Sequence, residues 1–259
     1  MSESTNQSHR FEGKVAIITG ASRGIGLAIA QRFVAEGARI CITARKIDPL
    51  MDAAAQFPQG SVLAIAGKAD DPVHRQEVLD RVAQEFGKLD ILINNAGINP
   101  VYGPTIDVDL DAARKILEVN LIGTLAWIQA AYRDERLGFN KGGNVVNISS
   151  STGDMPLPGI GLYGVSKAAI SHLTRTLAVE LGPNLRVNAV APAVIVTDFS
   201  KALYEGNEEA VISRYPMKRL GLSEDVASLV AFLASSDATW ITGQVATLDG
   251  GLLIAGGLA

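Results

Sequence analysis

The sequence predicts an α/β protein with a doubly wound, parallel, seven-stranded sheet and helices on both faces. Two observations support this. Short apolar, β-branched runs alternate with amphipathic stretches along the whole chain, and a glycine-rich turn joins the first run to the first stretch. Strict alternation favours parallel strands joined by right-handed crossovers. The predicted strands are residues 15–19, 39–43, 61–65, 89–94, 144–149, 186–190 and 244–248, and the predicted helical stretches lie near 24–36, 72–86, 109–136, 162–182 and 223–235.

The chain has 259 residues, of which 47% are hydrophobic, and this is enough to bury one sizeable core. Length alone could suggest two domains, but no linker, internal repeat or low-complexity segment divides the sequence. We therefore expect residues 1–10 to form a flexible polar tail and residues 11–259 to form a single domain.

Composition argues against several classes of function. The formal net charge is −4 and no segment is rich in lysine or arginine, so neither nucleic acid nor an anionic membrane is an expected partner. The polar N-terminus and the lack of a long apolar stretch favour a cytoplasmic protein. The three histidines share no metal-ligand spacing and Cys41 lies in an apolar run, so we expect no metal site and a buried thiol.

The turn after the first predicted strand has the glycine pattern of a phosphate-binding loop. Gly20 allows a tight turn, Gly24 lets the backbone approach a pyrophosphate, and Gly26 permits close packing of helix on strand. The positive end of the helix dipole would face the phosphate. The spacing is G-x-x-x-G-x-G rather than G-x-G-x-x-G, and a glycine turn without a ligand is the alternative. The other candidate contacts in this turn are Ser22, Arg23 and Ile25.

Tyr163 and Lys167 are four residues apart in a predicted helix, so both side chains project from one face. An ammonium about 5 Å from a phenol, at an effective dielectric near 20, contributes about 3 kcal/mol toward the phenolate. That is roughly two pK units, enough to bring a phenol of pKa about 10 into a useful range for acid/base catalysis. Ser150 precedes the tyrosine by thirteen residues. Taken alone, the pair is more typical of a partly exposed amphipathic face, and it gains weight only from the other motifs.

The end of the second predicted strand indicates which nucleotide would bind. A carboxylate at this position accepts a ribose 2′-hydroxyl, whereas a 2′-phosphate requires cations. The chain reads Thr43-Ala44-Arg45-Lys46 here, with no acid. Arg45 can stack on adenine and bind phosphate oxygens, and Arg23 offers a second cation. The sequence therefore predicts NADP(H) rather than NAD(H), the alternative being that both are merely solvated surface arginines.

Taken together, the motifs resemble those of the short-chain dehydrogenase/reductase family, a Rossmann-type family, from about Gly13 to Gly251. The landmarks are the glycine turn, Asn94-Asn95-Ala96-Gly97, Asn120, Ser150, Tyr163 with Lys167, the segment from Pro192 to Thr197, and Asp249-Gly250-Gly251.

The resemblance implies further cofactor contacts. Asn94, Ala96 and Gly97 would line the adenine ribose and brace the sheet, and Pro192, Ile195 and Thr197 would hold the nicotinamide. Two positions depart from the family: Ala193 replaces a common glycine, and Lys68 stands before Ala69 where an aspartate is common. The adenine contact at Ala69, within residues 68–71, is therefore left open.

The resemblance also implies a mechanism, in which hydride passes between nicotinamide and a carbonyl carbon while Tyr163 transfers a proton. Ser150 would bind the carbonyl oxygen, Lys167 would hold the ribose and lower the pKa of the phenol, and Asn120 would position a water. For Ser150, strand-end polarity is the alternative role, because Ser149 and Ser151 flank it. For Asn120, the alternative is stabilisation of a helix kink.

The substrate is less well indicated. Residues 198–218 occupy the position of the family's variable lid, and together with Met155, Leu157, Pro158 and Ile160 they suggest a partly apolar pocket. The chain resembles 3-oxoacyl-acyl-carrier-protein reductases in general appearance, and Lys141 matches one carrier-docking cation, although Asn184 falls at the other. A coenzyme A thioester, a free small ketone or secondary alcohol, and a non-catalytic NADP sensor are the alternatives.

Apolar surface on the long helices and on residues 250–259 predicts self-association. The resemblance implies a homotetramer.

Overall fold

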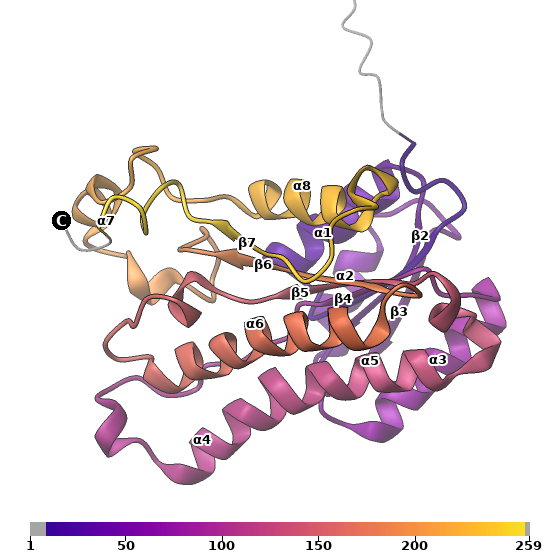
Figure 1. Ribbon diagram of the computed structural model, residues 1–259, viewed down its shortest axis with the longest axis horizontal. Helices are drawn as coiled ribbons and strands as arrows, with labels where there is room; N and C mark the ends of the chain where they lie inside the picture. The colour runs from indigo at the N-terminus through magenta and orange to yellow at the C-terminus, as the bar shows by residue number, and fades with distance from the viewer. Residues whose placement is uncertain (1–8, 257–259) are drawn as a thin grey trace, which may run out of the picture.

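The centre of the computed structural model, which describes residues 9–256, is a parallel sheet of seven strands in the order β3-β2-β1-β4-β5-β6-β7. Helices cover both of its faces (Figure 1). This confirms the predicted fold class. The strands are β1 Val15–Thr19, β2 Arg39–Ala44, β3 Val62–Ala66, β4 Ile91–Asn94, β5 Asn144–Ile148, β6 Arg186–Pro192 and β7 Val245–Leu248.

The central strands are buried on both faces because each alternates apolar side chains between two cores. In β1, Ala16 and Ile18 join a core under the helices α1 and α8, with Phe33 among its members. Val15 and Ile17 join the opposite core under α3, α5 and α6. All five residues of β1 are buried, as a parallel strand in the middle of a sheet requires.

Eight α-helices flank the described sheet. They are α1 Gly24–Ala35, α2 Ile47–Ala54, α3 Pro72–Phe86, α4 Leu110–Leu117, α5 Gly123–Arg133, α6 Gly161–Leu181, α7 Glu208–Ser213 and α8 Ser223–Ala234. The predicted helical stretch 109–136 is interrupted by a π-helical turn, Glu118–Ile122, between α4 and α5. The helices α2 and α7 were not predicted, because eight and six residues are too short to display a clear periodicity.

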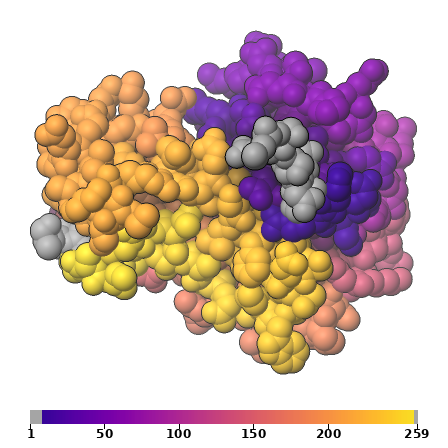
Figure 2. Space-filling model, turned by 90° about the horizontal axis from the view of Figure 1, so that it is seen from above, coloured from indigo at the N-terminus to yellow at the C-terminus, as the bar shows by residue number. Residues whose placement is uncertain are grey.

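The ends of the chain differ from expectation in one respect. Residues 1–8 of the predicted tail lie outside the described residues. Arg10, also expected in the tail, donates two hydrogen bonds to Glu36 at 2.6 and 2.7 Å, so it is tied to the end of α1. At the other end, Met217 N donates to Gly250 O at 3.2 Å, and Figure 2 shows the C-terminal residues lying against the predicted lid.

Across residues 9–256, no helix is both long and apolar enough to cross a membrane. The same residues contain no group of three or more histidine, cysteine, aspartate or glutamate side chains placed to hold a metal ion. Cys41 is fully buried, and burial raises the pKa of its thiol.

Candidate active site

The candidate site lies at the carboxyl edge of the sheet, beside the point between β1 and β4 where the order of the strands reverses. Parallel strands all end at this edge, so it collects the glycine turn after β1, residues 94–97 after β4, Ser150 after β5 and Pro192 at the end of β6. The fold therefore brings together motifs that lie up to about 170 residues apart in the sequence.

The turn between β1 and α1 accepts only glycine at its key positions. Gly20 and Gly24 have φ angles of +68° and +55°, a left-handed conformation that other residues rarely adopt. A Cβ on Gly20 would lie 2.9 Å from Ala96 Cα, and a Cβ on Gly26 would lie 2.5 Å from Gly20 O. The backbone of the turn is thus close-packed against the segment after β4, as a phosphate-binding loop requires.

The beginning of α1 leaves its backbone donors free for an anion. Arg23 is the N-cap residue, but its side chain makes no capping hydrogen bond, and the first turn contains no acidic residue. The first N–H groups of a helix have no partner within the helix and favour negative charge. Ser22 and Ile25, the other candidates in the turn, are partly buried. These features fit the pyrophosphate of a dinucleotide.

Asn95, which we did not single out from the sequence, clamps this turn. Its Nδ2 donates to Thr19 O and Gly20 O, both at 2.9 Å. Thr19 Oγ1 in turn accepts from the N–H groups of Asn95 and Ala96, both at 3.0 Å. The available signal was an amide just after one strand and a threonine at the end of the neighbouring strand.

Of the two roles expected for Asn94, the structure shows the bracing of the sheet. The side chain is 4% exposed, and its Nδ2 donates to Asn147 Oδ1 of β5 at 2.9 Å. Asn147 continues the chain of bonds to Thr174 on α6. Gly97 instead faces the catalytic candidates, because a Cβ there would lie 3.5 Å from both Lys167 Nζ and Asn120 Oδ1.

Lys167 and Tyr163 lie together on α6, as their spacing predicted. Lys167 is 3% exposed, its Nζ donates to Ile148 O at 2.7 Å, and it lies 5.4 Å from the centre of the Tyr163 ring. Burial lowers the pKa of Lys167 to about 8. Burial raises the pKa of Tyr163, and a hydrogen bond with Ser150 acts in the opposite direction. The expected lowering of the phenol pKa by Lys167 is not seen in the protein alone, where burial sets the direction and Ser150 is the group that opposes it.

The structure separates Ser150 from the serines on either side of it. Ser149 Oγ donates to Lys167 O at 2.9 Å and so fastens β5 to α6. Ser151 is 3% exposed and begins a short 3₁₀ turn. Ser150 is 8% exposed and accepts a hydrogen bond from Thr152 Oγ1 at 2.9 Å. Its hydroxyl also lies close enough to the Tyr163 hydroxyl to affect the pKa of that phenol through a hydrogen bond. Among the three, Ser150 is the one placed to bind a substrate oxygen.

Asn120 lies in the π-helical turn, and its side-chain amide is occupied by the protein itself. Nδ2 donates to Ile98 O and to Ser166 Oγ, both at 3.0 Å, and Oδ1 accepts from Ile98 N at 2.8 Å. The residue is fully buried. Both amide hydrogens are used, so the expected role of this side chain in holding a water is not supported. The alternative fits better: Asn120 stabilises the irregular turn and fixes Ile98 relative to α6.

The segment after β6 meets the glycine turn. A Cβ on Gly24 would lie 3.2 Å from Thr197 Cγ2, so Thr197 packs directly over this glycine. Thr197 Oγ1 donates to Ile195 O at 3.3 Å, and Ile195 is 4% exposed. Pro192, the last residue of β6, is buried. The three candidates for nicotinamide contact therefore belong to one segment of chain, which runs from the end of β6 to the glycine turn.

Asp198 and Phe199, the next two residues of this segment, contact Arg23 and Tyr163. Asp198 Oδ2 lies 3.3 Å from Arg23 Nη1, an ion pair in which both side chains are mostly exposed. The Phe199 ring centre is 5.9 Å from that of Tyr163. One short segment thus contacts both the glycine turn and the Tyr163 ring.

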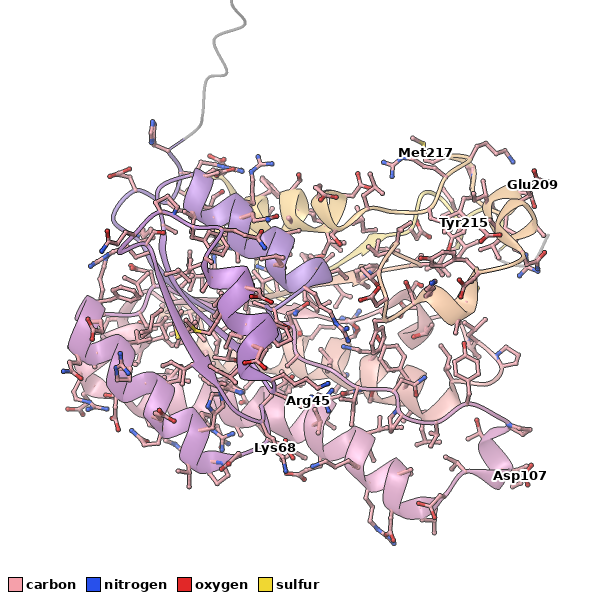
Figure 3. The ribbon with its side chains drawn as sticks, turned by 180° about the vertical axis from the view of Figure 1, so that it is seen from behind. Arg45, Lys68, Asp107, Glu209, Tyr215 and Met217 are labelled. Carbon is pink, nitrogen blue, oxygen red and sulfur yellow. The ribbon has the colours of Figure 1, made fainter. Side chains whose placement is uncertain are left out.

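Arg45, one of the two cations expected near the adenine ribose, lies at the end of a strand, and Lys68 lies at the end of the neighbouring strand. Arg45 follows β2 and Lys68 follows β3, which pair in parallel, and both side chains are exposed (Figure 3). The backbone at Ala69 is fixed by α5, because Trp127 Nε1 donates to the Ala69 carbonyl oxygen at 3.0 Å. Lys68, which we expected only to obscure the adenine contact, adds a third cation to Arg23 and Arg45.

Comparisons with known proteins identify the family of this chain. A family model described as Enoyl-(Acyl carrier protein) reductase matches residues 20–253. Dehydrogenase/reductase SDR family member 4 of Caenorhabditis elegans is 37% identical over 252 residues, which are 94% of this chain and 96% of that protein. Tropinone reductase-like 3 of Erythroxylum coca is 37% identical over 246 residues, 93% of this chain and 94% of that protein.

Solved structures share the fold. A short-chain dehydrogenase/reductase (glucose/ribitol dehydrogenase) from Brucella melitensis superimposes with a TM-score of 0.89 at 28% identity, covering 95% of this chain and 98% of that chain. A short-chain type dehydrogenase/reductase from Mycobacterium ulcerans has a TM-score of 0.88 at 31% identity, with 94% and 91% covered.

Proposed function

The chain belongs to the short-chain dehydrogenase/reductase family, and we propose that it is an NADP(H)-dependent carbonyl reductase that interconverts a small ketone and a secondary alcohol. The observation that carries this proposal is the convergence of Ser150, Tyr163 and Lys167 beside the nucleotide-binding turn. Gly97 and the Thr197 segment connect the two parts of the site.

The protein groups suit the reduction direction. NADPH, when bound, supplies the hydride that the carbonyl carbon gains. Ser150 holds the carbonyl oxygen, and the Tyr163 hydroxyl gives that oxygen its proton. The raised pKa keeps Tyr163 protonated at neutral pH, so it begins as the acid. The Lys167 ammonium, 5.4 Å from the ring, stabilises the phenolate that remains until solvent returns the proton.

The preference for NADP(H) rests on charge. Arg45 and Lys68 are exposed at the ends of the paired strands β2 and β3, and Arg23 is exposed in the glycine turn. The end of β2 offers no carboxylate to a 2′-hydroxyl, whereas cations there suit a 2′-phosphate. Arginine binds phosphate through paired hydrogen bonds, which makes Arg45 the main determinant.

A free ketone is our first choice of substrate, because the relatives named above suggest reductases of the carbonyl type. A 3-oxoacyl thioester, on a carrier protein or coenzyme A, is the second candidate. The family description and the exposed Lys141, which matches a carrier-docking position, favour it. A non-catalytic NADP sensor is opposed by the presence of all three catalytic candidates, since binding alone does not require them.

We also propose a homotetramer. Val165 and Val179 on α6, Trp240 and Ile254 are 56%, 84%, 99% and 93% exposed, an unusual loss of apolar burial for a monomer. Light scattering of the purified protein measures the assembly directly.

Turnover with paired substrates tests the function. We expect the protein to oxidise NADPH in the presence of cyclohexanone-type ketones, to use NADH at least about tenfold less efficiently, and to act more slowly on acetoacetyl coenzyme A. Faster reduction of acetoacetyl coenzyme A than of the ketones would favour a 3-oxoacyl thioester as the substrate. NADPH binding without turnover on ketones, thioesters, quinones or sugars would favour the sensor.

A further inference from the structure

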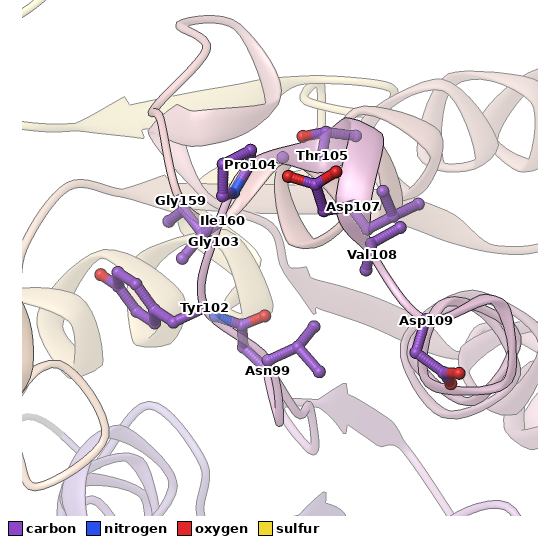
Figure 4. Close-up of a pocket in the computed structure, with 13 residues that line it drawn as sticks. Asn99, Tyr102, Gly103, Pro104, Thr105, Asp107, Val108, Asp109, Gly159 and Ile160 are labelled. Carbon is purple, nitrogen blue, oxygen red and sulfur yellow. The ribbon is translucent and has the colours of Figure 1, made fainter.

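A pocket of about 220 Å³ lies between the loop after β4 and the loop before α6 (Figure 4). Its lining comes from residues 99–109 and 159–162. Gly103 N donates to Gly159 O at 3.0 Å, which joins the two loops at the rim. A Cβ on Gly161 would overlap Thr105 Oγ1, so the loops are also in contact beside the first turn of α6. The pocket therefore has walls that two separate loops build together.

The pocket adjoins the proposed catalytic group. One lining residue, Leu162, directly precedes Tyr163, and another, Asn99, directly follows Ile98, which Asn120 holds through two hydrogen bonds. Gly97, two residues before Asn99, lies against the same catalytic candidates, because a Cβ there would be 3.5 Å from Lys167 Nζ. The loop that lines the pocket therefore begins beside the proposed reaction centre.

The lining of the pocket combines the hydroxyl groups of Tyr102 and Thr105 with an unpaired acceptor and a negative charge. The buried oxygen Oδ1 of Asn99 has no hydrogen-bond partner among residues 9–256. Asp107 is exposed on the lining, and no ion pair or side-chain hydrogen bond engages it within the same residues. Asp109 is already engaged, since its carboxylate caps α4 through Ala112 N at 2.8 Å. The lining contains no lysine or arginine.

We propose that this pocket binds the distal part of the carbonyl substrate, and that Asn99 and Asp107 select a ketone bearing a hydroxyl or ammonium group over one bearing a carboxylate or phosphate. A buried acceptor without a partner is satisfied by a donor on the ligand, and the Asp107 carboxylate attracts a cation and repels an anion. The inference rests on the proposed function and narrows its substrate class. It disfavours phosphate-bearing thioesters.

Four ring ketones of similar shape test the inference. They are cyclohexanone and its 4-hydroxy, 4-dimethylamino and 4-carboxylate derivatives, each assayed with NADPH for kcat/KM. We expect the hydroxyl and ammonium compounds to exceed the carboxylate by about tenfold or more, the effect of roughly one charge-assisted hydrogen bond. Asp107→Asn should reduce the advantage of the ammonium compound over cyclohexanone by about tenfold. Asn99→Leu should reduce the advantage of the hydroxyl compound as well.

Asp111→Asn is the matched control. Asp111 lies on the adjacent turn, pairs with Arg114 at 2.7 Å and does not line the pocket, so its loss should leave the ranking intact. Equal kcat/KM values for all four ketones, unchanged in both pocket variants, would overturn the inference while leaving the reductase proposal standing. If none of the ketones turns over, the reductase proposal fails, and calorimetric binding of the same ketones in the presence of NADPH still decides the pocket: the same ranking supports it, and its absence overturns it.

Discussion

The catalytic part of the site and its cofactor edge differ in how far their side chains are exposed to solvent. The catalytic candidates Ser150 and Lys167 and the supporting residue Asn120 are 8%, 3% and 0% exposed, and the protein itself supplies most of their hydrogen-bond partners. The cations Arg45 and Lys68 extend into solvent beside the cofactor edge. Substitutions in the buried part should therefore affect chemistry and folding together, whereas substitutions among the cations should change only which nucleotide binds.

The largest effect is expected at the reacting hydroxyl. Tyr163→Phe keeps the ring that packs on Phe199 and removes only the proton donor. Turnover should fall by about 10²- to 10⁴-fold, the usual contribution of a positioned acid. NADPH affinity, measured by fluorescence titration, should change little. Near-normal turnover would remove Tyr163 from the mechanism.

Asn120 tests whether the buried part is a connected network. Asn120→Leu leaves the Ile98 N–H, the Ile98 carbonyl and Ser166 without their partner, so the free energy of unfolding should fall by about 2–5 kcal/mol. Ser166→Ala removes one contact to Asn120 and the hydrogen bond from Ser166 to Tyr163 O, and it should lose about 1–2 kcal/mol. Urea denaturation measures both. Equal stability of the two variants would show that the amide does not join the loop to α6.

Arg45 tests the exposed part. Arg45→Asp replaces the cation proposed to bind the 2′-phosphate with an anion. The ratio of kcat/KM for NADPH over NADH should fall by about 100-fold, as expected for a charged hydrogen bond lost and a repulsion added. Stability should stay within about 0.5 kcal/mol of the starting protein. Arg81→Asp, at an exposed ion pair with Glu85 on α3, serves as the control for charge alone. Retained NADPH preference would contradict the assignment.

The pH dependence sharpens the contrast further. The pKa of Lys167 is about 8, so its ammonium is lost above that pH, and kcat/KM for reduction should then fall by about tenfold per pH unit. Tyr163, with its raised pKa, stays protonated in this range. Folding responds in the opposite sense, because an unfolded lysine with a pKa of 10.5 binds more protons than the folded one, so stability rises between about pH 8 and 10.5. A rate that stays flat through this window would argue against an essential ammonium.

The smallest effect concerns the ion pair that connects the two parts. Asp198→Asn releases Arg23 from a mostly exposed contact. The affinity for NADPH, measured by titration at low salt, should rise by about two- to fivefold, the range of a surface ion pair. NADH affinity should rise less, because it lacks the 2′-phosphate. Identical gains for both nucleotides would indicate that Arg23 does not contact that phosphate.

Local pattern was sufficient for the sheet and for the reacting groups. The run Val15–Thr19 is β1 with the predicted bounds, and the spacing of Tyr163 and Lys167 placed both on one helix. What the sequence could not reveal depends on contacts between distant segments. The clamp made by Asn95, the π-helical turn within the predicted stretch 109–136 and the desolvation that reverses the pKa expectation all arise only after packing.

Transfer of label from nucleotide to product tests the central claim most directly. The protein should be mixed with a cyclohexanone-type ketone and NADPH that carries deuterium in the position of the transferred hydride, and the alcohol should be analysed by mass spectrometry. We expect a single deuterium on the carbinol carbon, and Tyr163→Phe should form this product far more slowly while still binding NADPH. Alcohol without deuterium would contradict the account, and so would NADPH that binds but transfers no deuterium to any ketone.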